Sequence, residues 1–175
     1  KDEDFVFFNK LLTASPNDVG FDYFYGISAS LDIPPYVYIE NNIVVQLPSG
    51  TSEGSSESFE GAFWRKGPVS PDFNHYEVLD HLTTKAENYI KSQSGKENPF
   101  MLYFALTAPH LPWIPRDEFI GKSRAGAYGD LTAEVDATVG RINTLLKELA
   151  IDDNTLLIFT SDNGSQFSSE NIEKY

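Results

Sequence analysis

The chain has 175 residues, of which 41% are hydrophobic and 22% are charged. That length fits one domain of ordinary size, and the composition is too apolar for disorder and too interrupted by charge for a membrane span. Thirteen Lys and Arg stand against 26 Asp and Glu, for a net charge of -13, so DNA and RNA are poor partners. A small anionic substrate remains compatible, because a bound cation inverts the potential inside one pocket.

Cysteine is absent, which excludes disulfides, thiolate metal sites and a Cys nucleophile in this stretch and leaves the redox compartment unreadable. The chain opens Lys-Asp-Glu-Asp, with neither an initiator Met nor a secretory signal pattern. It stops at residues 173–175, soon after a motif of functional character. We therefore expect the chain to be a segment of a longer protein.

The first half of the chain carries weak periodicity. Residues 1–35 are aromatic and polar without a sustained repeat, which predicts a packed loop. Two β-branched runs, 37–39 and 43–45, flank an Asn pair that tolerates the positive φ of a tight turn, so we expect an antiparallel hairpin. Residues 48–61 are mainly Ser, Gly, Glu and Thr, which predicts a surface loop.

The second half has clearer patterns. Apolar residues at helical spacing predict helices over 75–92 and 129–149. Continuous apolar runs at 100–106 and 155–160 predict two strands that are buried on both faces. A strand, a helix and a strand in this order form a βαβ unit with parallel strands and a right-handed crossover. The predicted fold class is therefore α/β.

Unusual polar residues follow both predicted strands. His110 follows the first strand, and Asp162 and Asn163 follow the second. Ligands of parallel sheets bind at the carboxyl ends of the strands, so we expect the three side chains to share a pocket, with Asp and Asn oxygens suited to calcium or magnesium. The simpler interpretations are an Asp-Asn-Gly turn and a loop histidine that hydrogen-bonds to the backbone.

The other polar residues of the helical regions have simpler interpretations. Asp130, Glu134 and Asp136 lie near the start of the second predicted helix, where we expect them to complement the helix dipole or to face solvent. His75 and His81 lie in or beside the first predicted helix, where we expect structural roles.

Four stretches together resemble the sulfatases of the alkaline-phosphatase-like superfamily, especially bacterial arylsulfatases and glycan sulfatases. They are residues 20–26, residues 100–112 with their Pro-His-x-Pro core, residues 128–141, and residues 154–164 with their Asp-Asn-Gly ending. The resemblance implies an α/β/α sandwich that is present as a partial fragment with parallel strands and flanking helices. Residues 1–175 would be the middle of one catalytic domain, without the amino-terminal nucleophile region and the carboxyl-terminal part.

The resemblance implies hydrolysis of sulfate esters, on a sulfated glycan or an aryl sulfate. It assigns Asp162 and Asn163 to half of a calcium shell, and His110 to contact with the sulfate group. Asp32 and Tyr36 lie in a segment that resembles one near the substrate in bacterial relatives, so they would help to select the organic part. The implied cofactors are calcium and a formylglycine nucleophile, and the implied location of the parent protein is periplasmic or extracellular.

The nucleophile itself is not encoded in this segment. Formylglycine is made within Cys/Ser-x-Pro-Ser/Ala-Arg, and none of Arg65, Arg116, Arg124 or Arg141 ends such a sequence. Lys174 also lies outside the Gly-x-Lys setting of the family's active-site lysine. We therefore expect an isolated chain that is inactive, binds calcium weakly and self-associates through exposed sheet edges. The alternatives are a phosphoester or phosphonate hydrolase of the same superfamily, and a non-catalytic calcium-binding or interaction module.

Overall fold

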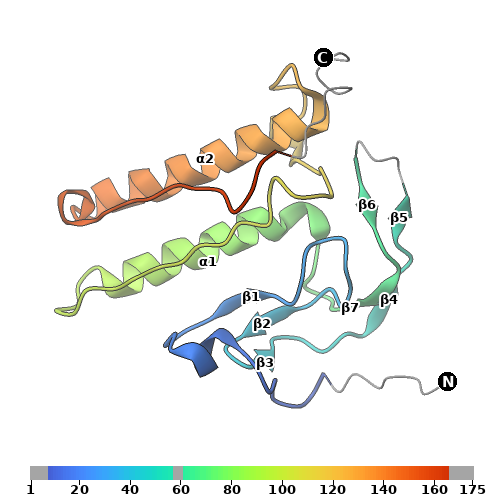
Figure 1. The fold of residues 1–175 in the computed structure, drawn as a ribbon, viewed down its shortest axis with the longest axis horizontal. Coiled ribbons are helices and arrows are strands. Elements are labelled where there is room, and N and C mark those ends of the chain that lie inside the picture. Colours follow the sequence, from blue (N-terminus) through green and yellow to red (C-terminus); the bar gives the residue numbers. More distant parts are fainter. Residues whose placement is uncertain (1–7, 57–60, 166–175) are drawn as a thin grey trace. The chain divides into compact units, whose positions relative to one another are not determined.

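The computed structural model describes residues 8–56 and 61–165. Its contacts divide the chain into two compact units, Lys1–His75 and Tyr76–Tyr175. Figure 1 shows the elements that each unit contains. The expectation of one catalytic domain over residues 1–175 stays a prediction. Among the helices of the described part, none is both long enough and apolar enough to cross a membrane.

The first unit contains a small antiparallel sheet in the order β1-β2-β3. Its strands are β1 (Tyr25–Ile27), β2 (Tyr38–Glu40) and β3 (Ile43–Val44). The predicted hairpin is confirmed, since Ile39 pairs with Val44 and Asn41 takes the left-handed conformation with φ of 56° that Asn tolerates in turns. Val37, Ile39 and Val44 form the buried face, against which Phe24 packs.

Two parts of the first unit differ from expectation. The predicted packed loop over residues 1–35 includes β1 and a short 3-10 turn, Pro16–Val19, and its residues 1–7 lie outside the described part. A strand of three residues is too short to show a period, which is why the pattern missed it.

The predicted loop over residues 48–61 instead contributes strands to two antiparallel ladders, apart from residues 57–60, which lie outside the described part. The strands are β4 (Gly50–Ser52), β5 (Ser55–Ser56), β6 (Phe63–Trp64) and β7 (Gly67–Val69), paired β4 with β7 and β5 with β6. Composition alone cannot show this, because the apolar cover comes from the partner strands. The two ladders are also linked, because the indole Nε1 of Trp64 in β6 donates to the hydroxyl of Ser52 in β4 at 3.1 Å.

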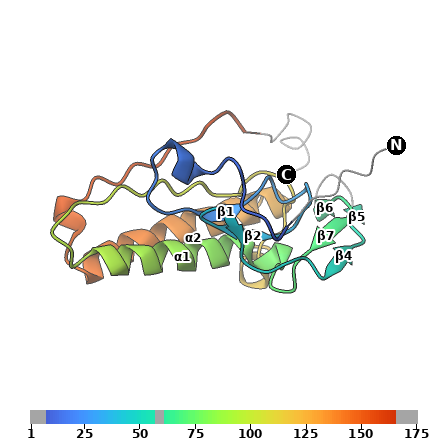
Figure 2. The ribbon, with the colours of Figure 1, turned by 90° about the horizontal axis from the view of Figure 1, so that it is seen from below.

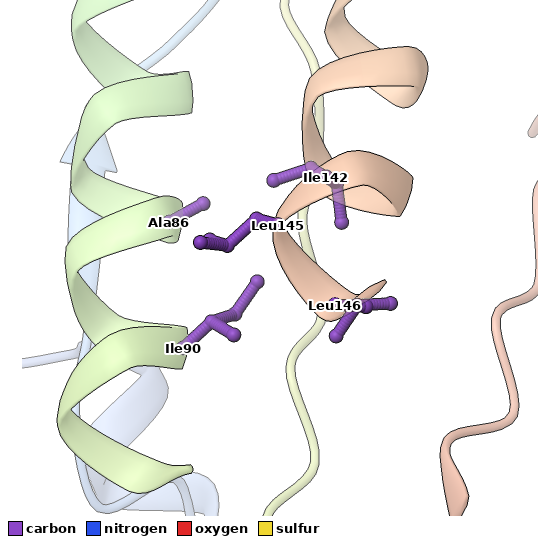
Figure 3. Packing of buried hydrophobic residues seen from close by; sticks show 5 residues of the cluster. All are labelled: Ala86, Ile90, Ile142, Leu145 and Leu146. Carbon is purple, nitrogen blue, oxygen red and sulfur yellow. The ribbon is translucent and has the colours of Figure 1, made fainter. Parts of the chain in front are cut away.

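The second unit is built on two long helices, and both predicted helices are confirmed. They are α1 (Val78–Gln93) and α2 (Gly126–Glu148), accompanied by the 3-10 turns Asp117–Phe119 and Asp152–Asn154, while a third turn, His75–Glu77, leads into α1. The helices pack side by side, with Ala86 and Ile90 of α1 facing Ile142 and Leu145 of α2 (Figure 3). At the edge of this interface, the Arg141 guanidinium bonds to Glu87 at 2.9 Å and to Asp80 at 2.5 Å.

The segment 100–106 lies along the helix pair, but it forms no strand ladder with any described part of the chain. Phe100, Phe104 and Leu106 pack on the hydrophobic clusters of the helices, whereas Met101 and Tyr103 are 75% and 73% exposed. Alternation of covered and exposed side chains is the pattern of an extended chain with one buried face. The prediction of a strand buried on both faces is therefore wrong for this chain.

The segment 155–160 also forms no ladder in the described structure, and Leu156, Ile158 and Phe159 are 84%, 71% and 68% exposed. Both segments run along the same side of the helix pair (Figures 1 and 2). A strand needs a hydrogen-bonded neighbour on at least one edge, and the described residues supply none here. The predicted pair of parallel strands is therefore not formed within these residues.

Candidate active site

His110 lies in an exposed loop between segment 100–106 and α2. Its Nδ1 lies 2.8 Å from the carbonyl oxygen of Leu111. A carbonyl oxygen only accepts hydrogen bonds, so Nδ1 carries the hydrogen and Nε2 is the ring nitrogen left for a ligand. Nε2 then donates a hydrogen bond only when the imidazole is protonated.

Trp113 anchors this loop to the helices. Its side chain is buried with Leu79, Leu131 and Val135, and its Nε1 donates to the carbonyl of Pro109 at 3.2 Å. The hydrogen bond joins the residues on either side of His110. The indole therefore closes the short stretch of backbone that carries the histidine.

Arg116 anchors the end of the same loop to α2. Glu134 accepts from the Arg116 backbone N–H at 3.0 Å and from its Nε at 2.9 Å. The Glu134 side chain is 3% exposed and that of Arg116 is 25% exposed, and Arg116 also pairs with Asp80 and Glu118. The expectation that Glu134 complements the dipole or faces solvent is wrong, because the arginine compensates the buried charge.

Asp130 is likewise buried, contrary to expectation, whereas Asp136 is exposed. The Asp130 carboxylate accepts the backbone N–H groups of Gly121 and Ser123, each at 2.7 Å. Burial opposes its ionisation, but these hydrogen bonds outweigh that cost and lower the pKa of Asp130. Asp130 thus holds the turn that precedes α2 against the first turns of the helix.

Asp162 and Asn163 lie in an exposed turn, in which the Ser161 hydroxyl donates to the Asn163 carbonyl at 2.6 Å. Among the residues that the structure describes, the Asp162 carboxylate has neither a hydrogen bond nor an ion pair, and no such bond joins this turn to His110. The structure does connect the two loops through Tyr128. The Tyr128 ring lies edge-on to that of Trp113, with 5.1 Å between centroids, and its hydroxyl lies 2.7 Å from that of Ser165.

The donor set of the turn fits part of a calcium site. Calcium takes about six to eight oxygen ligands, commonly carboxylate and amide oxygens, and Asp162 and Asn163 offer one of each at exposed positions. Within residues 8–56 and 61–165, no group of three or more His, Cys, Asp and Glu side chains gathers to complete a shell. The remaining ligands of such a site would have to be waters or oxygens from elsewhere.

Asp32 and Tyr36 are buried in the first unit, where both hold Arg65. Asp32 is 8% exposed and pairs with Nη1 of Arg65 at 2.6 Å, while the Tyr36 hydroxyl donates to the Arg65 carbonyl at 2.6 Å. Burial raises the pKa of Asp32, but the Ser30 hydroxyl and the guanidinium outweigh it and hold the pKa below its usual range. The Arg65 side chain is 53% exposed, so it is the solvent-facing member of this group. No sequence signal links positions 32 and 65.

The structure confirms a structural role for His75. It is 8% exposed and its ring stacks on Trp64 at 4.2 Å between centroids, with the edge of Tyr36 at 4.4 Å. Its Nε2 has no hydrogen-bond partner among the described residues. Burial lowers the pKa of His75 to about 4, against the opposing effect of a hydrogen bond to the Leu31 backbone.

Comparison with known proteins places these features in a family. The sulfatase family model matches residues 6–175. An N-acetylgalactosamine-6-O-sulfatase of Bacteroides thetaiotaomicron is 34% identical over 188 residues, covering 90% of this chain and 36% of the relative. The N-acetylgalactosamine-6-sulfatase of Mus musculus is 37% identical over 109 residues, covering 62% of this chain and 21% of the relative.

A solved structure that concerns the metabolism of multiple glycosaminoglycans by Bacteroides thetaiotaomicron superposes with a TM-score of 0.77 at 28% identity. The superposition covers 95% of this chain and 42% of that one. The chain belongs to the sulfatase family, and the predicted α/β fold class, in partial form, is confirmed. It spans 36% of the length of its Bacteroides relative.

Proposed function

We propose that the full-length protein hydrolyses sulfate esters of a glycan, with 6-sulfated N-acetylgalactosamine as the substrate class. Membership of the sulfatase family over residues 6–175 carries this proposal, and relatives with that named specificity support the substrate class. The contact of the His110 loop and the Asp162 turn with one side chain, Tyr128, supports a shared site.

In this proposal, His110 donates a proton to the sugar oxygen that leaves the sulfate group. When the S–O bond to the sugar breaks, negative charge grows on the sugar oxygen, and a nearby N–H donor stabilises it. The hydrogen bond from Nδ1 to the Leu111 carbonyl leaves Nε2 as the ring nitrogen for the substrate, so that the protonated ring presents one N–H for that oxygen. The proton then passes from Nε2 to the oxygen and completes the hydroxyl of the product.

Asp162 and Asn163 provide two of the oxygens that hold calcium in this proposal. When bound, calcium supplies positive charge for the sulfate oxygens, which matters in a chain of net charge -13. The absence of other partners for Asp162 among the described residues supports this role. The nucleophile would be a formylglycine, which residues 1–175 do not encode.

Asp32 and Tyr36 influence substrate choice through Arg65 in this proposal. They are too buried to meet a ligand themselves, but they fix the backbone and one nitrogen of an exposed guanidinium. A guanidinium binds sulfate and carboxylate groups, both of which occur on acidic glycans. A glycan substrate of this kind favours a periplasmic or extracellular location for the full-length protein.

Release of inorganic sulfate from a 6-sulfated N-acetylgalactosamine oligosaccharide by the full-length protein tests the proposal. We expect His110→Ala and Asp162→Asn each to lower kcat/KM by about a hundredfold or more, and a calcium chelator to abolish turnover reversibly. Asp153→Asn is the matched control, because it makes the same change at an exposed turn on the other side of segment 155–160. Full activity of both site variants would disprove the proposal, and sulfate release without any calcium would remove the metal from it.

A further inference from the structure

The backbone that carries His110 is held at both ends by groups of the second unit. Trp113 ties to Pro109 across the histidine, and its ring is buried among side chains of α1 and α2. Arg116 is fixed by two hydrogen bonds to Glu134, which lies in the third turn of α2. The loop is therefore held both by its own Trp113–Pro109 hydrogen bond and by contacts with α1 and α2.

Tyr128, in the first turn of α2, contacts both functional loops at once. Its ring meets the edge of Trp113 at an interplanar angle of 69°, and its hydroxyl bonds to Ser165. Ser165 follows directly on the Asp162-Asn163-Gly164 turn. One side chain of a rigid helix thus limits the movement of the histidine loop and of the candidate metal turn.

We propose that Trp113 and Tyr128 are positioning residues, which hold His110 and the Asp162–Asn163 turn in register so that both reach the same sulfate group. This inference rests on the proposed function. Its physical basis is that groups next to a metal ligand or a proton donor change metal affinity or activity by about ten- to a hundredfold when they are removed. Neither residue needs to touch the substrate.

Double-mutant cycles in the full-length protein test the role of Trp113. Trp113→Phe keeps an aromatic ring and removes the N–H that binds Pro109, so we expect kcat to fall by about tenfold with little change in KM. In the His110→Ala background the same substitution should have almost no further effect, because the positioned group is absent. A general weakening of the fold would lower activity equally in both backgrounds, and that result would overturn the proposal.

Calcium titration by calorimetry tests the role of Tyr128 without any turnover. Tyr128→Phe and Ser165→Ala each remove the same hydrogen bond, so both should weaken calcium binding by a similar factor of about ten, and the double variant should be no worse than either single one. Tyr103→Phe is the control, because Tyr103 is 73% exposed and its substitution should leave affinity unchanged.

The two proposals fail in distinguishable ways. An unaltered calcium affinity in Tyr128→Phe, or additive losses in the double variant, would overturn the positioning role while His110→Ala still shows its loss of about a hundredfold in kcat/KM. If His110→Ala and Asp162→Asn both kept full activity, the proposed function would fail, and the positioning of these residues would fail with it. Thermal unfolding of each variant distinguishes both outcomes from a loss of fold. If Trp113→Phe unfolds, Tyr128→Phe still tests the proposal, because it keeps the aromatic ring and removes only the hydroxyl.

Discussion

Among the described residues of the second unit, the most buried charge is the Glu134 carboxylate. Arg116 compensates this charge through its backbone N–H and its Nε. A buried pair of this kind contributes little when both partners are present, but the loss of one partner leaves the other uncompensated. The Arg116–Glu134 pair has a positioning role here, because it fixes the place at which the His110 loop contacts α2. Stability and placement of the candidate site therefore depend on the same residue.

We expect Glu134→Gln to lower the free energy of unfolding by about 2 kcal/mol, because hydrogen bonds to charged groups are worth roughly 1.5–3 kcal/mol. Urea denaturation followed by circular dichroism measures this. Asp136→Asn is the control on the same helix, since Asp136 is exposed and should change stability by no more than about 0.5 kcal/mol. Equal effects of the two variants would show that burial of Glu134 does not matter.

His75 makes stability depend on pH. Its pKa is about 4 in the folded chain against an ordinary 6.5, so the unfolded chain binds the proton more readily. The contribution of the neutral ring is complete above about pH 6.5 and is lost as the pH falls towards 4, by up to about 3 kcal/mol. Denaturation midpoints measured across this window should show a slope that His75→Phe removes. The same slope in both proteins would contradict the burial of a neutral histidine.

Sequence reasoning selected His110, Asp162 and Asn163 because their types and their positions after apolar runs are visible in one dimension. It missed Trp113 and Tyr128, because an edge-to-face contact between residues fifteen positions apart has no signature in a single sequence. Arg65 was missed for the same reason. Residues that act through tertiary contacts can be identified only from the structure.

At the scale of elements, helices were easier to predict than strands. The pattern of a helix refers to its own residues, so α1 and α2 were located within a few positions. A strand depends on partners elsewhere, and the runs 100–106 and 155–160 have no ladder in the described structure. Both runs were predicted as strands buried on both faces, and this prediction is wrong, because Met101 and Tyr103 of the first run and Leu156 of the second are mostly exposed.

Exposed apolar residues of segment 155–160 should drive association of the isolated chain. Leu156, Ile158 and Phe159 are mostly exposed, and reburial of apolar surface contributes roughly 25 cal/mol per Å². We expect light scattering at micromolar concentration to show dimers or larger species, and Ile158→Lys to reduce them. Ser92→Lys adds the same charge at an exposed polar position and should not. A monomeric wild-type chain would contradict this expectation.

At the scale of the whole molecule, the chain contains part of what the proposed reaction needs. It carries the His110 loop and the two side chains proposed as calcium ligands, Asp162 and Asn163, and it spans 36% of the length of its Bacteroides relative. Two oxygen ligands are far fewer than calcium takes. The isolated chain should therefore bind calcium only weakly in calorimetry, and submicromolar affinity abolished by Asp162→Ala would show that the shell is complete within it.

The central claim is that the full-length protein acts on sulfate esters, and paired substrates test it most directly. The measurement compares kcat/KM for one N-acetylgalactosamine oligosaccharide bearing either a 6-sulfate or a 6-phosphate, with the released anion determined by ion chromatography. We predict turnover of the sulfate ester that exceeds turnover of the phosphate ester by at least about a hundredfold and that depends on His110. Preference for the phosphate ester would identify a phosphoester hydrolase of the same superfamily, and no turnover of either ester would favour a non-catalytic module; both results would contradict the proposed function.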